Sequence, residues 1–274
     1  MSEIKLIALD LDGTLLRSDK TVSARNAQAL HRAAERGAEI VVASGRYYTG
    51  IPEQVRSLPF IRYYICINGA AVFDMKMGRA LHREEIPLAR AQEIYDELCR
   101  LDVIYDCYQD DLGWLDTRFF AEIPNYVQIP SLCEYLYTRH PLENFRQSLD
   151  RRGRSLQKIQ AFFHTTRERD RELARLRELF PDMAISSSMP YNIEINSRRA
   201  NKGAALQALV AQLGLQPETI MAFGDGLNDL TMLQYAGHSV AMENGAAEAK
   251  AAARYQAASN DADGVAQIVE QWFQ

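Results

Sequence analysis

Short apolar runs alternate with amphipathic stretches near the start of the chain. Strands are predicted at Ile4–Leu9, Glu39–Ala43 and Tyr63–Ile67, with a helix from about Ser23 to Arg36 after the first strand. A short helix is expected near Gly50–Ser57, before the third strand. Apolar runs that end at turn residues are typical of buried strands, and their alternation with helices indicates a parallel sheet.

The same alternation returns between residue 189 and residue 274. Together the two segments predict an α/β fold whose core is a doubly wound, Rossmann-like parallel sheet. The elements expected in the second segment are, in order, strand Asn192–Ile195, helix Asn201–Leu213, strand Ile220–Phe223, strand Ser239–Met242, helix Ala246–Ala253 and helix Gly264–Trp272.

Residues 85–188 follow a different, less regular pattern. In this segment Thr166–Leu179 alternates basic and acidic residues, which is typical of a solvated helix face. We expect a discontinuous core domain, residues 1–84 and 189–274, and an inserted α+β cap domain, residues 85–188, that lies over the ligand edge of the sheet as a lid. The other elements expected in the cap are helix Pro87–Arg100 and strands Val103–Tyr108, Gly113–Asp116, Gln157–Phe163 and Met183–Ser186.

Composition argues against several classes of protein. Lys and Arg number 31 and Asp and Glu 36, a net charge of −5 that disfavours binding to nucleic acid by phosphate neutralisation. The four cysteines show neither C-x-x-C pairs nor zinc-ligand spacing. No stretch approaches the roughly 20 apolar residues of a membrane span. We expect a reduced, cytoplasmic protein without a nucleic-acid or membrane partner, and the sequence predicts no oligomeric state.

Polar residues stand directly after the predicted core strands, where open α/β sheets bind their ligands. Two unit charges about 4 Å apart repel by about 4 kcal/mol at an effective dielectric constant of about 20, so several carboxylates at one edge need a cation. Oxygen ligands without nearby His or Cys favour Mg²⁺. The residues are Asp10 and Asp12 after the first strand, Ser44 and Gly45 after the second, Lys202 near a helix start, and Asp225, Asn228 and Asp229 after Ile220–Phe223.

The other polar residues at these strand ends suit a phosphate group. Ser44 offers a hydroxyl and Gly45 an unobstructed backbone N–H. Lys202 is a mobile positive charge near helix N–H groups, and Asn228 is a neutral donor. Each also has an ordinary interpretation, as a turn, a solvated lysine or a helix cap. A dinucleotide site is disfavoured, because G-D-G-L-N-D lacks a third glycine and puts Asp225 where a pyrophosphate needs neutral backbone.

Taken together, the motifs resemble those of the haloacid dehalogenase superfamily, and within it the Cof-type sugar-phosphatase-like branch with a large C2-type cap. The resemblance extends over the whole chain, including Asn68-Gly69-Ala70 and the segment SNDADGV at 259–265. The roles it implies are Asp10 as nucleophile, Asp12 as general acid/base, Ser44 as the hydroxyl of the second motif, Lys202 as the lysine of the third, and Asp225 and Asp229 as the acids of the fourth.

The resemblance also implies a two-step mechanism. Asp10, Asp225 and the backbone carbonyl of Asp12 would hold Mg²⁺, supported by Asp229 and Asn68. Asp10 would attack phosphorus and form an aspartyl phosphate, while Asp12 would protonate the leaving alkoxide and later activate water. The residues expected to contact the phosphate are Leu11, Ser44, Gly45, Lys202 and Asn228.

Two positions depart from the usual sequence of the branch. Ser44 stands where Thr is common, which keeps the hydroxyl, and Glu243-Asn244-Gly245 replaces Gly-Asn-Ala, so the role of that loop stays open. The expected substrate is a small phosphorylated metabolite, in particular a sugar phosphate. The alternatives are a phosphotransferase or phosphomutase on the same fold and a non-catalytic sensor of phosphorylated ligands. Retention of both Asp10 and Asp12 disfavours the sensor.

Overall fold

A computed structural model describes residues 3–187 and 189–273. The chain divides into two compact units, one formed by Met1–Arg83 with Asn201–Gln274 and the other by Glu84–Ala200. The predicted return to the core at residue 189 is therefore wrong. The strand that begins at Asn192 pairs with strands of the second unit, and the chain re-enters the first unit only at Asn201.

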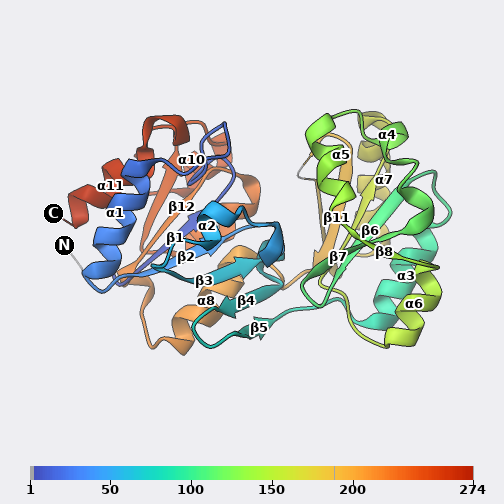
Figure 1. Ribbon diagram of the computed structural model, residues 1–274, viewed down its shortest axis with the longest axis horizontal. Helices are drawn as coiled ribbons and strands as arrows, with labels where there is room; N and C mark the ends of the chain where they lie inside the picture. The colour runs from blue at the N-terminus through green and yellow to red at the C-terminus, as the bar shows by residue number, and fades with distance from the viewer. Residues whose placement is uncertain (1–2, 188, 274) are drawn as a thin grey trace. The chain divides into compact units, whose positions relative to one another are not determined.

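The first unit contains an eight-stranded sheet (Figure 1). Its strands are, in spatial order, β14 (Tyr255–Ala257), β13 (His238–Met242), β12 (Ile220–Gly224), β1 (Leu6–Asp10), β2 (Glu39–Ala43), β3 (Ile61–Cys66), β4 (Ala71–Asp74) and β5 (Arg79–Arg83). The pairs from β14 to β3 are parallel, whereas β4 and β5 add antiparallel strands at one edge. The α/β class is confirmed, and the β4–β5 hairpin is an element that the sequence pattern did not indicate.

Helices pack on both faces of this sheet. Leu6 and Ala8 of β1 pack against apolar residues of the helices at Lys202–Gln212 (α8) and Leu230–Tyr235 (α9). Ile7 and Leu9 point to the opposite face and are also fully buried. On that side α1 and α11 lie side by side (Figure 1). The remaining helices and 3₁₀ turns are α1 (Ala24–Glu35), η1 (Tyr48–Gly50), α2 (Glu53–Arg56), η2 (Ile67–Gly69), η4 (Pro217–Thr219), η5 (Leu227–Asp229), α10 (Ala247–Ala252), η6 (Asn260–Ala262) and α11 (Gly264–Trp272).

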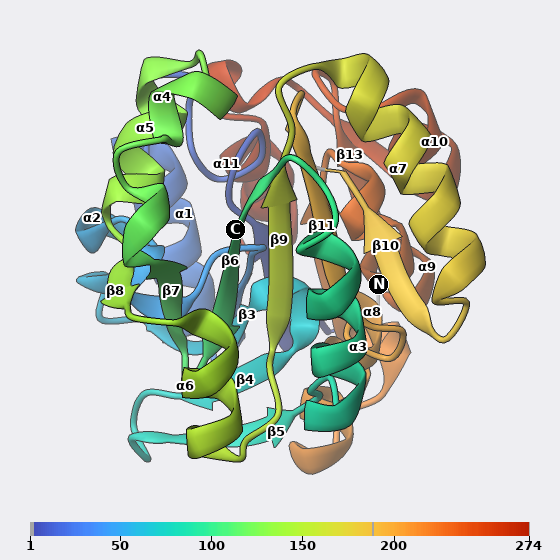
Figure 2. The same ribbon diagram turned by 90° about the vertical axis from the view of Figure 1, so that its right-hand side faces the viewer.

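The second unit has its own sheet of six strands (Figure 2). The order is β10 (Met183–Ser186), β11 (Asn192–Ser197), β9 (Lys158–Phe162), β6 (Ile104–Gln109), β7 (Leu112–Asp116) and β8 (His140–Leu142). All neighbours are antiparallel except β7 and β8. One apolar cluster joins the sheet to α3 (Leu88–Leu98), α6 (Phe145–Arg152) and α7 (Thr166–Leu179). Another joins it to α4 (Ile123–Tyr126) and α5 (Pro130–Tyr137), beside the turn η3 (Thr117–Phe119).

Helix α7 shows how local sequence sets an element of this unit. Thr165 caps it by accepting from the backbone N–H of Glu168, and the Glu168 side chain accepts from the Thr165 N–H in return. Leu176 is buried, whereas most of the charged residues lie toward solvent, as the charge alternation predicts. Among the described residues, no helix is long and apolar enough to cross a lipid bilayer.

Candidate active site

The carboxyl end of β1 places Asp10 inside the first unit. β1 lies between β2 and β12, and the Asp10 residue is only 6% exposed. Opposite it, Lys202 is the first residue of α8 and is completely buried. The Lys202 Nζ donates to Asp10 Oδ1 at 2.5 Å and to Asp229 Oδ1 at 2.6 Å. The expectation that Lys202 is mobile is therefore wrong, because two carboxylates hold its ammonium group.

The loop after β12 brings in the remaining acids. Asp229, on η5, accepts at Oδ2 from the backbone N–H groups of Asp225 and Gly226, both at 2.9 Å. Carboxylate oxygens of Asp10, Asp225 and Asp229 all lie within 4.8 Å of one another. Gly13 makes this approach possible, because it has a φ of 89° and a Cβ there would lie 2.4 Å from Asp225 Oδ2. The fourth-motif acids and Asp10 thus meet as predicted from the sequence.

The charges in this cluster are not balanced. Burial raises the pKa of Asp10 well above its usual range, and although Lys202 opposes this effect, the nearby Asp229 and Asp225 add to it. Burial and then Asp229 raise the pKa of Asp225. Burial alone would lower the pKa of Lys202, but Asp10 and Asp229 outweigh it and raise that pKa. Three carboxylates facing one ammonium group, with oxygen donors only, fit a hard divalent cation such as Mg²⁺.

The Asp12 carboxylate lies in a separate ion-pair group. Arg46 donates to it from Nε at 2.9 Å and from Nη2 at 3.0 Å, and Lys20 Nζ donates at 2.9 Å. Arg46 also donates from Nη1 to the carbonyl of Gly50 at 3.2 Å, which fixes the guanidinium plane. Burial would raise the pKa of Asp12, but Arg46 and Lys20 outweigh it and lower that pKa.

The two basic partners of Asp12, Arg46 and Lys20, are not predicted from the sequence. Arg46 directly follows Ser44 and Gly45, so its place after a core strand was the available signal. Lys20 gave no such signal, because it lies in a polar loop and reaches Asp12 only through the fold.

The residues predicted to contact phosphate gather beside the end of β1. Ser44 follows Ala43, the register partner of Asp10, and its Oγ accepts from the Arg46 N–H at 3.2 Å. Gly45 has no room for a side chain, because a Cβ would lie 2.9 Å from Asn68 Oδ1. Asn228 Nδ2 donates to that same oxygen at 3.5 Å.

Leu11 lies between Asp10 and Asp12. Its residue is fully buried, and its carbonyl accepts from the Leu16 N–H at 2.8 Å. Asn68 has a left-handed backbone with a φ of 55°, and its N–H donates to the Ser44 carbonyl at 3.1 Å. These backbone contacts hold the two loops that carry the predicted phosphate contacts.

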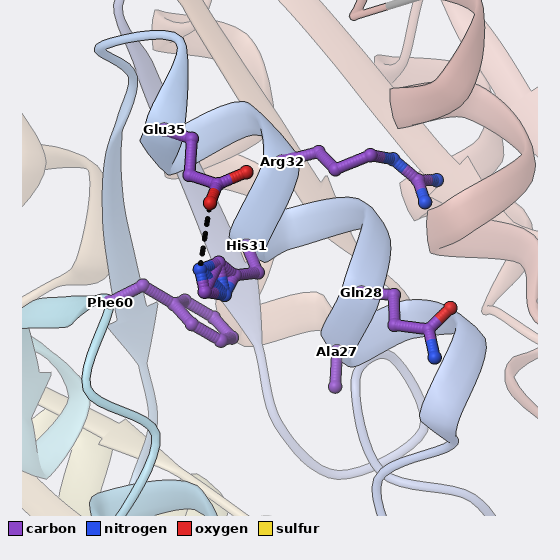
Figure 3. Close-up of a pocket in the computed structure, with 6 residues that line it drawn as sticks. All are labelled: Ala27, Gln28, His31, Arg32, Glu35 and Phe60. Atoms are coloured by element: carbon purple, nitrogen blue, oxygen red, sulfur yellow. Dashed lines mark ion pairs between the residues drawn. The ribbon is translucent and has the colours of Figure 1, made fainter.

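A hollow of about 390 Å³ lies elsewhere, on the surface of α1. It is lined by Ala27, Gln28, His31, Arg32, Glu35 and Phe60, and His31 Nε2 lies 3.4 Å from Glu35 Oε1 (Figure 3). None of the residues predicted for the site lines it.

The family model, the relatives and the solved structure that match this chain agree with one another. A family model described as haloacid dehalogenase-like hydrolase matches residues 7–269. A phosphatase of Bacillus subtilis, YwpJ, is 32% identical over 97% of this chain and 99% of its own. A second protein of that organism, the 5-amino-6-(5-phospho-D-ribitylamino)uracil phosphatase YcsE, is 30% identical over 98% of this chain and 96% of its own. The crystal structure of a haloacid dehalogenase-like hydrolase from Bacteroides thetaiotaomicron superposes with a TM-score of 0.83 at 27% identity, covering 98% of this chain and 99% of that one.

Proposed function

The chain belongs to the haloacid dehalogenase-like hydrolase family and is a phosphatase of that family, and from this premise we propose that it is a Mg²⁺-dependent enzyme that hydrolyses phosphate esters of small metabolites. One observation carries the proposal: a buried carboxylate, Asp10, stands at a strand end with one lysine and two further carboxylates around it. Such an arrangement is costly for folding and fits a centre for phosphoryl transfer.

Asp10 is the nucleophile in this proposal. Its carboxylate oxygen forms a bond to phosphorus while the bond from phosphorus to the leaving oxygen breaks, which gives an aspartyl phosphate. Lys202 holds Oδ1 of Asp10 and offsets negative charge at the reacting group, because its ammonium is fixed 2.5 Å away. Mg²⁺, held by Asp10, Asp225 and the Asp12 carbonyl, would neutralise phosphate charge when bound.

Asp12 moves the protons. It gives a proton to the leaving alkoxide in the first step and takes one from the water that attacks phosphorus in the second, when the bond to Asp10 breaks. In the arrangement described above, Asp12 is a carboxylate paired with Arg46 and Lys20. A substrate phosphate beside Asp12 would raise its pKa by charge repulsion and so favour the protonated form that the first step needs.

The substrate class that we propose is a phosphorylated sugar or sugar alcohol. The name of the Bacillus subtilis relative YcsE describes a substrate with its phosphate on a ribityl chain, and that relative matches nearly the full length of this chain. An alkoxide of this type is a poor leaving group, which gives the proton from Asp12 a role.

A phosphate-release screen tests the proposed function. The metal-free enzyme is assayed on a panel of phosphorylated metabolites with and without added Mg²⁺, and Asp10→Asn is the matched control because it keeps the shape of the side chain. We expect release of inorganic phosphate only with Mg²⁺ and only from the enzyme with Asp10. Full activity in excess chelator, or transfer of the phosphoryl group to a sugar instead of water, would contradict the proposal.

A further inference from the structure

The loop after β13, Glu243-Asn244-Gly245, departs from the usual sequence of the branch. It is hydrogen-bonded to the turn at Gly13–Leu16, which follows β1. Asn244 Nδ2 donates to the carbonyl of Gly13 at 2.8 Å. Asn244 Oδ1 accepts from the backbone N–H of Asn260 at 3.0 Å. Because the amide oxygen is engaged by an N–H group, the amide nitrogen is the atom that faces Gly13. The orientation of the Asn244 side chain is thus set by both of its neighbours.

A second asparagine is hydrogen-bonded to the other end of the same turn. Asn260, at the start of η6, is only 6% exposed, and its Nδ2 donates to the carbonyl of Leu16 at 2.8 Å. The two amides therefore hold the carbonyls of Gly13 and Leu16, which bracket the turn that carries Thr14 and follows directly on Asp12. The Asn260 amide is buried, so breaking its hydrogen bond to the Leu16 carbonyl would leave unpaired polar groups inside the protein, and this makes the amide a rigid support.

The Asn244 loop also contacts the chain that carries Asp225. The backbone N–H of Ala246 donates to the Asp225 carbonyl at 2.8 Å, and a Cβ on Gly245 would lie 3.0 Å from Asp225 Cα. One short loop therefore touches both the Asp225 loop and the Gly13 turn. The Thr14 hydroxyl joins the same two segments directly, by donating to Asp225 Oδ1 at 3.0 Å.

The segment that contains Asn260 holds the adjacent polar loop as well. Ser18 donates to Asp261 from its backbone N–H at 2.8 Å and from Oγ at 2.6 Å, and Arg17 Nη2 donates to Asp263 at 2.8 Å. This loop continues to Lys20, the partner of Asp12. The C-terminal segment thus supports the chain that follows Asp12, from Leu16 to Ser18.

We propose that Asn244 and Asn260 are positioning residues for the metal and proton-transfer centre, since they hold the Gly13–Leu16 turn in register with Asp225. The proposal rests on the proposed function and extends it to residues that touch neither substrate nor metal. Side chains that orient the ligands of a metal site typically contribute about 10- to 100-fold to metal affinity or activity. The loop at 243–245 then acts on the site through the turn, without contacting phosphate.

The experiment compares Asn244→Ala and Asn244→Asp with the wild-type enzyme. Glu243→Gln is the matched control, because Glu243 is the exposed neighbour on the same loop and its backbone N–H donates to the Ala257 carbonyl, which lies outside the Asn244 and Asn260 contacts. Asn244 is itself exposed, so its variants are expected to fold, and a thermal melt checks this. Titration calorimetry of Mg²⁺ into the metal-free protein measures affinity without any turnover, and kcat/KM is measured for phenyl phosphate and p-nitrophenyl phosphate.

We expect both Asn244 variants to bind Mg²⁺ about 10- to 100-fold more weakly, with the control within about twofold of wild type. Asn244→Asp is the sharper variant: an added carboxylate should tighten Mg²⁺ by charge alone, whereas loss of the donor to Gly13 should weaken it. The kcat/KM should fall more for phenyl phosphate than for p-nitrophenyl phosphate, because phenolate is the poorer leaving group and depends on a well-placed Asp12.

Two results would overturn the inference. One is Mg²⁺ affinity in Asn244→Asp equal to or tighter than wild type. The other is an equal loss of kcat/KM for both esters, which is what a general loosening of the fold produces. Failure of the proposed function would appear in the wild-type enzyme, as no phosphate release with Mg²⁺, whereas failure of this inference appears only in the variants.

Discussion

Among the residues that the structure describes, two lysines are almost completely buried, one in each unit, and the charges around them differ. Lys202 in the first unit is held by Asp10 and Asp229 at the ends of strands. Lys158 in the second unit lies within β9 and donates to Glu194 of β11 at 2.8 Å. Burial of a charge costs free energy in both places, so the difference between them lies in how each charge is compensated.

Around Lys158 the charges balance. The neighbouring Asp106 pairs with Arg139 at 2.6 Å, so two acids face two bases inside the second unit. Around Lys202 a third carboxylate, Asp225, leaves an excess of negative charge. A balanced group is satisfied by the folded chain alone, whereas an excess of buried carboxylates calls for a cation. We therefore expect the group around Lys202 to take part in catalysis and the group around Lys158 to stabilise the fold.

Removal of each lysine in turn should give the largest difference between the two groups, in kcat/KM. We expect Lys202→Met to lower kcat/KM by about 10³- to 10⁴-fold, because charge at the reacting carboxylate is no longer offset. Lys158→Met should leave kcat/KM of the folded enzyme within a few-fold of wild type. Steady-state kinetics on p-nitrophenyl phosphate, normalised to folded protein, measures both. Comparable losses in the two variants would show that the second group also takes part in turnover.

The free energy of unfolding, in contrast, should be sensitive to removal of Lys158. Lys158→Met removes the ammonium group that pairs with the buried Glu194 carboxylate, which we expect to lower the free energy of unfolding by about 3–5 kcal/mol. The double variant Lys158→Met/Glu194→Leu removes both charges and should recover most of that loss. Urea unfolding followed by circular dichroism measures each. A double variant as unstable as the single one would show that the loss of stability does not come from the Glu194 charge that Lys158 compensates.

Mg²⁺ should stabilise the protein through the first group. At a metal concentration about 100 times the dissociation constant, binding adds about 2.7 kcal/mol to the free energy of unfolding. We expect the melting temperature to rise with Mg²⁺ in the wild type and to rise much less in Asp225→Asn, which lacks one carboxylate ligand. Differential scanning calorimetry measures the shift. An equal rise in both proteins would place the bound metal elsewhere.

The ion pair between Asp74 and Arg62 lies outside the site. Its removal should have the smallest effect on the free energy of unfolding, and this effect should depend on pH. Asp74 on β4 accepts from Arg62 at 2.7 and 3.0 Å, and this arginine holds the pKa of Asp74 below its usual value. A lowered pKa stabilises the fold fully above the ordinary value of about 4, and the contribution is lost as pH falls through the lower folded value. Asp74→Asn should therefore cost about 2 kcal/mol at neutral pH and progressively less in acid, with activity unchanged. A pH-independent cost in urea unfolding would contradict this assignment.

The strand that carries Asp10 was predictable from the sequence, because the apolar run Ile4–Leu9 is followed directly by Asp10 and Asp12. The sequence did not indicate β4 and β5, because β4 has only 4 residues and the edge strand β5, Arg79–Arg83, carries little apolar periodicity. The strand at Asn192 was assigned to the wrong sheet, because an alternating strand shows the same pattern whichever neighbour it pairs with. The ion pair of Arg46 with Asp12 spans 34 residues and arises only when the chain folds.

The proposed mechanism requires that Asp10 becomes phosphorylated and that Asp12 transfers the protons. The most direct measurement is rapid mixing of Asp12→Asn with p-nitrophenyl phosphate, followed by acid trapping and mass spectrometry. Nitrophenolate leaves without a proton, so the first step should survive, whereas the second step lacks its base and should slow by about 100- to 10,000-fold. We expect release of about one equivalent of nitrophenolate, then a stall, with phosphate trapped on Asp10. Slow, linear release from the start with substrate bound, or trapped enzyme without phosphate on Asp10, would contradict this mechanism.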